Sequence, residues 1–414
     1  MKRQFLLLAF LVASMGIAMA QKFMGGDISL LPKYEEKGAT YFDKDGNKIS
    51  DVLLYMKAQG MNSMRLRLFV DPSKAPEDHK KQGVCQDLDF VKKLGKRIKD
   101  NGLSLLLDLH YSDTWTDPGQ HSVPAAWAGK GVTEMGVAVY DYTKSVLQEM
   151  KAYGAEPDFI QVGNEVTFGM LWETGHVYPS SADRWDNFTL YLKKGAEACR
   201  EVCPKAGIVV HVELSGQGGN VEPFLQRLSG YSVDYDIIGL SYYPYFHGAL
   251  STLGGLLTRL ESTYPTKKIQ LVEAGYPHAY YPSDPTFNYK ATYPDTEEGQ
   301  RKFTADLVAL LNQHKQVNGF YWWWPEANEK GIDWQSAVTG SWYNCGLWDN
   351  ATGKAMAALY ELKAFVGDLS HDGIQETRMS TGEKAQSLYD LQGRSVTASS
   401  KGVLIKDGKK FIQH

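Results

Sequence analysis

The chain has 414 residues and a formal net charge of −4, so no basic surface predicts binding to nucleic acid. Its four cysteines are too few for a disulfide-stabilised scaffold, and no CxxC motif or histidine cluster indicates a zinc site. A single disulfide would use two of these cysteines, and the sequence leaves the pairing open.

Residues 1–20 have the organisation of a signal peptide. Lys2 and Arg3 precede an apolar run from Phe5 to Ala18, and small residues lead up to Ala20. A basic start, a short apolar core and an A-x-A end predict cleavage after Ala20 rather than a membrane anchor. No later segment reaches the ~20 apolar residues of a spanning helix. We therefore expect an exported protein without a membrane span, which is periplasmic, bound to the cell surface or secreted.

Strand-like and helix-like stretches alternate over residues 21–367, which is typical of an α/β fold with a parallel sheet. Strands are predicted over residues 23–29, 63–70, 104–110, 159–163, 208–214, 237–242, 269–273 and 319–323. Helices are predicted over residues 87–101, 134–153, 183–202, 250–264, 297–314 and 354–365. Eight strand–helix units favour a closed (β/α)8 TIM barrel over an open sheet.

The composition changes after about residue 368. Ser, Thr, Gly and Lys dominate residues 368–414, and short alternating runs occur at 387–391 and 402–405. This pattern predicts a small C-terminal β extension outside the barrel, which carries no chemistry.

Ionisable residues share one face of several predicted strands. They alternate with apolar residues as Arg65 and Arg67, as Asp108 and His110, and as His211 and Glu213. One inward charge could belong to a buried structural pair, but polar residues on three strands favour a functional centre, because unpaired buried charge is costly. Barrel active sites gather at the carboxyl ends of the strands.

Two glutamates follow this rule. Asn164 and Glu165 end the fourth predicted strand, and Glu273 ends the seventh. Without further context, an Asn-Glu pair would be interpreted as a helix-capping asparagine followed by a solvent-exposed glutamate. Two carboxylates facing each other across a barrel mouth suit glycoside hydrolysis, in which one stays protonated as the acid and the other is ionised. A separation of about 5 Å would imply retention, and a wider one inversion.

Tryptophans also stand in predicted loops beside Gly, Pro and Asp. They are Trp115, Trp127, Trp172 and Trp342. Their flat faces would suit stacking against sugar rings. An ordinary aromatic core is the alternative interpretation.

Taken together, the motifs resemble those of glycoside hydrolase family 53, the endo-β-1,4-galactanases. The resemblance runs from about residue 25 to residue 365. The segments that carry it are 26–29, 60–67, 108–119, 124–127, 161–165, 169–172, 238–244 and 272–277. The third-strand segment, 108–119, is the most specific of them.

The resemblance implies that Glu165 is the acid/base, Glu273 is the nucleophile and Asn164 binds the sugar 2-hydroxyl. The remaining predicted substrate-binding residues are Arg65, His110, Tyr242, Asp108, Trp115 and Trp322. The implied substrate is β-1,4-galactan, cleaved internally to galactooligosaccharides. We expect a monomer that needs no cofactor for catalysis.

The sequence departs from the family pattern at two places. Residues 321–326 read Tyr-Trp-Trp-Trp-Pro-Glu where the family has Tyr-Trp-Glu-Pro, which leaves open the tryptophan that floors the site. The loop at 278–284 lacks the Asp-x-His-x-Asn calcium motif of some bacterial relatives, so a structural calcium would need other ligands, such as Asp284 or Asn288.

Two other functions compete with this interpretation. A mannanase, xylanase or β-glucanase on the same barrel would carry the same two glutamates, and only the family motifs argue against it. A non-catalytic carbohydrate-binding protein on a decayed barrel is a different class, and the presence of both carboxylates argues against it.

Overall fold

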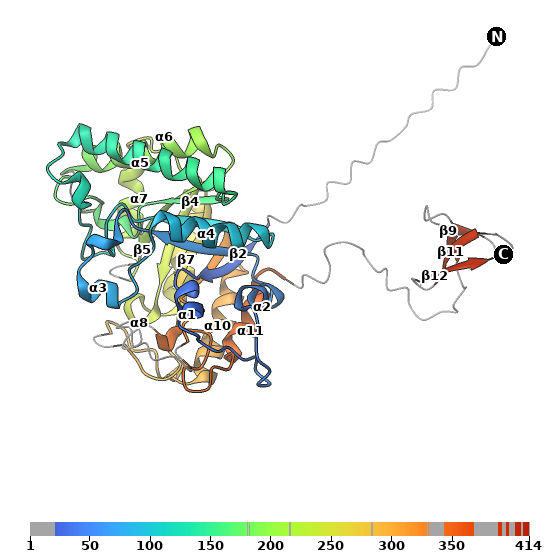
Figure 1. Ribbon diagram of the computed structural model, residues 1–414. Helices are drawn as coiled ribbons and strands as arrows, with labels where there is room; N and C mark the ends of the chain where they lie inside the picture. Colours follow the sequence, from blue (N-terminus) through green and yellow to red (C-terminus); the bar gives the residue numbers. More distant parts are fainter. Residues whose placement is uncertain are drawn as a thin grey trace, which may run out of the picture. The chain divides into compact units, whose positions relative to one another are not determined.

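A computed structural model describes residues 21–179, 181, 183–214, 217–282, 285–328, 330 and 343–367, together with four short strands near the C-terminus (Figure 1). The chain divides into two compact units, with the boundary between residues 368 and 369. The first unit contains the barrel and the second contains the C-terminal strands, and each is described by itself below.

Eight parallel strands close into a barrel in chain order, with β1 paired to both β2 and β8. The strands are β1 Phe23–Asp27, β2 Ser63–Leu68, β3 Ser104–Leu109, β4 Phe159–Val162, β5 Gly207–Glu213, β6 Ile237–Tyr242, β7 Lys268–Ala274 and β8 Val317–Trp323. The predicted (β/α)8 fold is confirmed, and all eight strands lie where the sequence placed them.

Helices cover the outside of the barrel. They are α1 Leu31–Glu36, α2 Val52–Ala58, α3 Glu77–Lys81, α4 Leu88–Asp100, α5 Val132–Tyr153, α6 Trp185–Val202, α7 Val221–Ser229, α8 Pro244–His247, α9 Leu250–Thr263, α10 Glu297–Leu311 and α11 Ala357–Glu361. The long helices α5 and α6 lie side by side outside β4 (Figure 1). Within the described residues, no helix is long and apolar enough to cross a membrane.

Local sequence explains where the helices begin and which face they bury. The Asp87 side chain accepts a hydrogen bond from the Phe90 amide and so caps α4. The buried side chains of α4 recur at helical spacing, as Val91, Leu94 and Ile98 do. The helix therefore presents one apolar stripe to the barrel.

The barrel interior is divided into an apolar end and a polar end. An apolar cluster fills part of it, formed by Leu106, Phe159, Val209 and Ile237 from the first half of their strands and by Val272 and Tyr321 from later positions. Because this cluster closes one end of the barrel, the inward polar residues collect at the carboxyl ends of the strands, which position the site.

A bulge in β7 turns Glu273 toward the interior. Leu240 pairs with Leu271, but the next residue of β6, Ser241, pairs with Glu273, so Val272 is an extra residue on β7. Val272 itself packs in the apolar interior cluster. The bulge thus lets two successive residues of β7 face the barrel interior, which strict alternation would not allow.

The C-terminal unit contains an antiparallel sheet with the strand order β10-β9-β11-β12. Its strands are β9 Leu388–Asp390, β10 Ser395–Val396, β11 Gly402–Lys406 and β12 Lys409–Gln413. The predicted β character of this segment is therefore confirmed. All four cysteines, Cys85, Cys199, Cys203 and Cys345, are free thiols in the barrel unit.

Candidate active site

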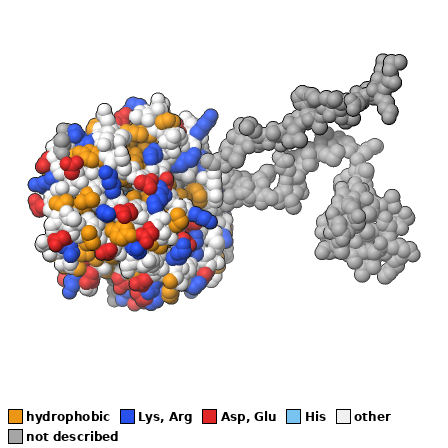
Figure 2. All heavy atoms as spheres, turned by 90° about the horizontal axis from the view of Figure 1, so that it is seen from above, with side chains coloured by type: hydrophobic (Ala, Val, Ile, Leu, Met, Phe, Trp, Pro, Cys, Tyr) orange, Lys and Arg blue, Asp and Glu red, His pale blue; other side chains and the backbone are white. Residues whose placement is uncertain are grey.

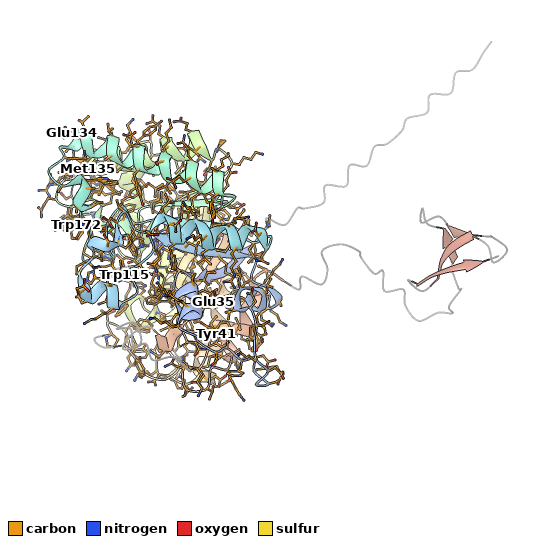
Figure 3. All side chains as sticks on the ribbon, in the orientation of Figure 1. Glu35, Tyr41, Trp115, Glu134, Met135 and Trp172 are labelled. Carbon is orange, nitrogen blue, oxygen red and sulfur yellow. The ribbon has the colours of Figure 1, made fainter. Side chains whose placement is uncertain are left out.

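A cavity of about 510 Å³ opens at the carboxyl ends of the strands, and both predicted catalytic glutamates line it. Its aromatic walls include Trp115, Trp323 and Tyr243. In Figure 3, Trp115 and Trp172 project from the loops after β3 and β4, on the same side of the barrel unit. This placement matches the rule that barrel sites form on the loops that follow the strands.

Glu273 is held by two donors. Arg65 Nη2 lies 2.9 Å from Glu273 Oε1, and the Tyr243 hydroxyl donates to Oε2 over 2.9 Å. Burial raises the pKa of Glu273 to about 7, while the Arg65 charge and the Tyr243 hydrogen bond oppose that rise. Both donors stabilise the ionised carboxylate, which is the form that a nucleophile needs.

Glu165 stands in a different environment. Burial and the charges of Glu273 and Glu213 raise the pKa of Glu165 well above its ordinary range, against a lowering by Ser241. Ser241 Oγ donates to Glu165 Oε1 over 2.6 Å. Glu165 also has a left-handed backbone, with φ of 45°, two residues after Gly163 with φ of 86°. Of the two glutamates, Glu165 is the one whose surroundings favour the protonated form more strongly.

Arg65 is the centre of a buried polar network. Its guanidinium contacts Asp27 Oδ2 at 2.9 Å, Asp108 Oδ2 at 2.8 Å and Asn164 Oδ1 at 2.9 Å. Burial alone would raise the pKa of Asp108, but the charge of Arg65 and the hydrogen bond from His110 hold it below its ordinary value. Arg65 is thus fixed by β1, β3 and the end of β4 while it reaches Glu273.

Two predicted substrate-binding residues lie behind the cavity wall. Asp108 is fully buried, and His110 Nε2 lies 3.0 Å from Asp108 Oδ2. Neither residue lines the cavity, and Arg65, which was also predicted to bind substrate, is fully buried and does not line it either. Their contacts make them supports of Arg65, which corrects the predicted role of direct substrate contact. Asn164 does line the cavity, and its Nδ2 donates to Thr116 O over 2.7 Å.

Tyr242 does not lie in the site, and this corrects the prediction. Its hydroxyl donates to Gly248 O over 2.8 Å, and its ring stacks on Phe303 of α10. The neighbouring Ser241 and Tyr243 contact the two glutamates instead. Side chains alternate along a strand, so Ser241 and Tyr243 share the inner face and Tyr242 faces the helices.

The same alternation corrects the choice of Trp322. Its indole Nε1 donates to Cys345 O over 2.6 Å, and the side chain is fully buried outside the cavity. Trp323 and Trp324 line the cavity. Trp115 lines it too, as the sequence predicted. The sequence therefore identified the correct segment of β8 but the wrong tryptophan.

Arg67 lies between the three tryptophan rings that line the cavity. Its guanidinium carbon lies 4.9 Å from the ring centroid of Trp115, 4.8 Å from that of Trp323 and 4.9 Å from that of Trp324. Arg67 Nη1 also pairs with Asp27 Oδ1 at 2.8 Å. A cation among aromatic faces fixes their positions and leaves a rigid apolar wall beside the glutamates.

The other loop tryptophans have different surroundings. Trp127 packs against Tyr111 and Tyr142 in the core. Trp172 stacks on His176 with ring centroids 3.8 Å apart. Neither lines the cavity, and Trp342 lies outside the described residues.

Glu213 and His247 complete the polar lining. Glu213 ends β5, as the inward pattern predicted, and His247 Nε2 lies 3.6 Å from its Oε2. The Tyr243 amide donates to His247 Nδ1 over 2.9 Å, which orients the imidazole. The sequence missed His247 because it belongs to α8, a short helix after β6 that no strand pattern reveals.

The proposed calcium ligands are divided between described and undescribed residues. Asn288 Oδ1 accepts a hydrogen bond from the Lys290 amide over 3.0 Å, whereas Asp284 lies outside the described residues. Among the residues that the structure describes, no three His, Cys, Asp or Glu side chains form a group that could hold a metal ion.

Comparison with known proteins identifies relatives of the barrel unit. The sequence profile of glycosyl hydrolase family 53 matches residues 23–362. A Niallia circulans protein from the bgaB 5′ region is 33% identical over 353 residues, covering 82% of this chain and 93% of the relative. An endo-β-1,4-galactanase of Bacillus subtilis is 30% identical over 308 residues, covering 73% of this chain and 69% of that enzyme.

A solved structure agrees with these relatives. The family 53 catalytic domain from Ignisphaera aggregans superposes with a TM-score of 0.71 at 30% identity, covering 86% of this chain and 98% of that domain. The family profile spans every strand of the barrel and includes both glutamates of the cavity. The resemblance seen in the sequence is therefore confirmed, and the chain belongs to glycosyl hydrolase family 53.

Proposed function

We propose that the protein is an endo-acting, retaining glycosidase that cleaves β-1,4-galactan to galactooligosaccharides. One observation carries the proposal: two glutamates share a cavity, but their environments favour opposite protonation states. Arg65 and Tyr243 favour ionised Glu273, whereas burial and two neighbouring carboxylates favour protonated Glu165. A retaining glycosidase requires this division between nucleophile and acid.

The reaction proceeds in two displacements. The Glu273 carboxylate attacks the anomeric carbon, the glycosidic C–O bond breaks, and Glu165 gives its proton to the leaving oxygen. Glu165 then removes a proton from water, whose oxygen bonds to the anomeric carbon and displaces Glu273. Asn164, held by Thr116 and Arg65, lies beside both glutamates and would bind the sugar 2-hydroxyl.

The substrate assignment rests on the relatives and on the cavity walls. The Bacillus subtilis relative is an endo-β-1,4-galactanase, and the aromatic wall of Trp115, Trp323 and Trp324 suits the apolar face of a galactose ring. The chain shares its family with that enzyme, which favours galactan over mannan or xylan.

Three further properties belong to the proposal. Residues 1–20 would direct export and be removed after Ala20. The enzyme would act as a monomer. Catalysis would need no metal ion, because the two carboxylates perform both proton transfer and nucleophilic attack. Treatment with EDTA should leave the rate on galactan unchanged.

The direct test incubates the purified protein with galactan, mannan and xylan. We expect cleavage of unbranched galactan alone, a rapid fall in viscosity, and short oligosaccharides that retain the β-anomeric configuration. Galactose released only from the chain end, or no activity on galactan, would contradict the substrate. Inverted products would contradict the retaining mechanism.

The matched pair Glu273→Ala and Glu165→Ala tests the two roles. Glu273→Ala should lose activity on galactan and on aryl galactosides, and azide should restore turnover with an inverted product. Glu165→Ala should lose roughly 10²–10⁴-fold on galactan, yet still form the glycosyl-enzyme from a substrate with an activated leaving group. Azide should then give a product of retained configuration. If the two variants exchanged these behaviours, the assignment would be reversed.

A further inference from the structure

A closed chain of hydrogen bonds surrounds Glu165. Ser241 Oγ lies 2.6 Å from Glu165 Oε1, and His211 Nε2 lies 2.8 Å from Ser241 Oγ. The backbone amide of Glu165 returns to His211 Nδ1 over 3.2 Å. Ser241 and His211 are fully buried, and they come from β6 and β5. The chain thus joins both the side chain and the backbone of Glu165 to two neighbouring strands.

The geometry fixes the direction of each bond. The Glu165 amide can only donate, so His211 Nδ1 must accept from it. Asn164 Oδ1 also lies 3.0 Å from Nδ1, but this oxygen accepts from Arg65 and Gln161 and forms no hydrogen bond with the ring in this tautomer. The Gln161 amide group also donates to Nδ1, over 3.0 Å. Burial and the charge of Arg65 lower the pKa of His211 well below its ordinary value, so the ring is neutral and Nε2 carries its only proton. Nε2 therefore donates to Ser241 Oγ, whose own proton is directed at Glu165 Oε1.

We propose that Ser241, oriented by His211, is a positioning residue that reserves Glu165 Oε1 as an acceptor and places the acidic proton on Oε2. This rests on the proposed role of Glu165 as acid/base. Oε2 accepts no hydrogen bond from the described residues, so it stays available to the leaving oxygen. The hydroxyl of Ser241 keeps its own proton throughout.

The bond acts differently in the two protonation states. When Glu165 gives its proton away, Oε1 shares the new negative charge, and the bond from Ser241 becomes stronger. Interactions that strengthen in the transition state accelerate the step. The hydrogen bond from Ser241 also lowers the pKa of Glu165, whereas the carboxylates that face Glu165 raise it. These carboxylates are Glu273 of β7, Glu213 of β5 and Asp117 of the loop after β3. His121, whose Nε2 lies 3.3 Å from Glu165 O, is neutral because burial lowers its pKa to about 3.

The test is Ser241→Ala, which removes one oxygen atom. We expect kcat/KM on galactan to fall roughly 10- to 100-fold, because a hydrogen bond to a developing charge is lost. The pKa of Glu165 should rise without this donor, so the alkaline limb of kcat/KM should move to higher pH. Glycosyl-enzyme formation from an activated aryl galactoside should change little, because that step does not need the acid.

Two variants separate positioning from a general structural effect. Ser63 is also a fully buried serine that faces the barrel interior, but its hydroxyl bonds Tyr321 at 2.8 Å. Ser63→Ala should leave the pH profile in place. Ser241→Thr keeps a hydroxyl and should restore part of the activity and the wild-type alkaline limb. If Ser241→Ala does not fold, Ser241→Cys, with a weaker donor, should shift the limb in the same direction by less.

A second arm examines His211. His211→Asn keeps an acceptor near the Glu165 amide, but its shorter side chain does not place a donor at the Nε2 position that contacts Ser241. If both residues act through one chain, the Ser241→Ala/His211→Asn double variant should lose little more activity than Ser241→Ala alone. Full additivity of the two losses would overturn the orienting role of His211.

The outcomes distinguish this proposal from the proposed function. If Glu165→Ala abolishes the alkaline limb but Ser241→Ala leaves that limb and the leaving-group dependence unchanged, the positioning role of Ser241 is wrong and the function stands. If Glu165→Ala leaves the alkaline limb in place, Glu165 is not the acid, and both proposals fall.

Discussion

At the scale of single residues, the site gives identical side chains opposite tasks through their neighbours. Glu273 faces a guanidinium and a phenol, whereas Glu165 faces a serine and three carboxylates. Burial raises the pKa of both, so the difference must come from these contacts. The arginine and tyrosine favour an ionised Glu273, and the carboxylates favour a protonated Glu165.

The adjacent residues Tyr242, which ends β6, and Tyr243, which follows it, test this difference at Glu273. Tyr243→Phe removes a donor that lowers the pKa of Glu273, so that pKa should rise. Because the nucleophile must be ionised, the acidic limb of kcat/KM should move to higher pH. We expect kcat/KM at the optimum to fall about 10- to 100-fold, since a bond to a charged group is lost. An unmoved acidic limb would contradict the role of Tyr243.

Tyr242→Phe is the matched control, because it removes the same atom from the neighbouring residue. The lost bond runs to Gly248 O, so the free energy of unfolding should fall by about 1 kcal/mol. Its pH profile on galactan should match that of the wild type. A shifted limb in this variant would place Tyr242 in the site after all.

At the scale of elements, the strands were predictable, whereas the faces of some strands were not. In β2, Arg65 and Arg67 alternate with apolar residues, so the pattern itself reveals the inner face. At the end of β8, Trp322 and Trp323 face opposite sides and Trp324 follows the strand, so the hydrophobicity of the three residues does not show which of them face inward. Strand β6 has the same ambiguity around Tyr242 and Tyr243. In both strands the prediction chose the residue that faces the helices.

The bulge of β7 is a further feature that sequence alone does not encode. Strict alternation would place Val272 and Glu273 on opposite faces, yet both point inward. Glu273 was nevertheless predicted correctly, because the family motif and the strand end identified it without reference to the face. The contacts of Ser241, His247 and Asp27 depend on segments far apart in the chain, and only the closed barrel brings them together.

The tryptophans of β8 provide the prediction at this scale. Trp323→Ala removes part of the cavity wall, so KM for galactan should rise and kcat/KM should fall by roughly tenfold. Trp322→Ala leaves a hole between the barrel and its helices and should lower the free energy of unfolding by about 3–5 kcal/mol. Chemical denaturation and initial rates on galactan measure both effects. If the two variants exchanged effects, the orientation of β8 described above would be wrong.

At the scale of the whole molecule, the chemistry is confined to one compact unit. Among the described residues, all those that line the cavity lie between Gln82 and Trp324. On the face seen in Figure 2, Lys and Arg side chains are interspersed with Asp and Glu, as the small net charge of the chain predicts. A surface of mixed charge suits a neutral polysaccharide, because a patch of positive or negative charge would not attract an uncharged substrate over long distances.

The last prediction concerns the C-terminal unit. Its boundary lies between residues 368 and 369, beyond every residue that lines the cavity. Removing residues 373–414 should therefore leave kcat/KM on galactan within a few-fold of the full chain, and the Tm of the barrel should stay nearly unchanged. The control ends the chain after Ala355, which also removes α11. Ala358 and Leu359 of α11 are buried, and the helix packs against α10, so this shorter chain should unfold at lower temperature. Complete loss of activity in a folded 1–372 chain would mean that the C-terminal unit contributes to the site.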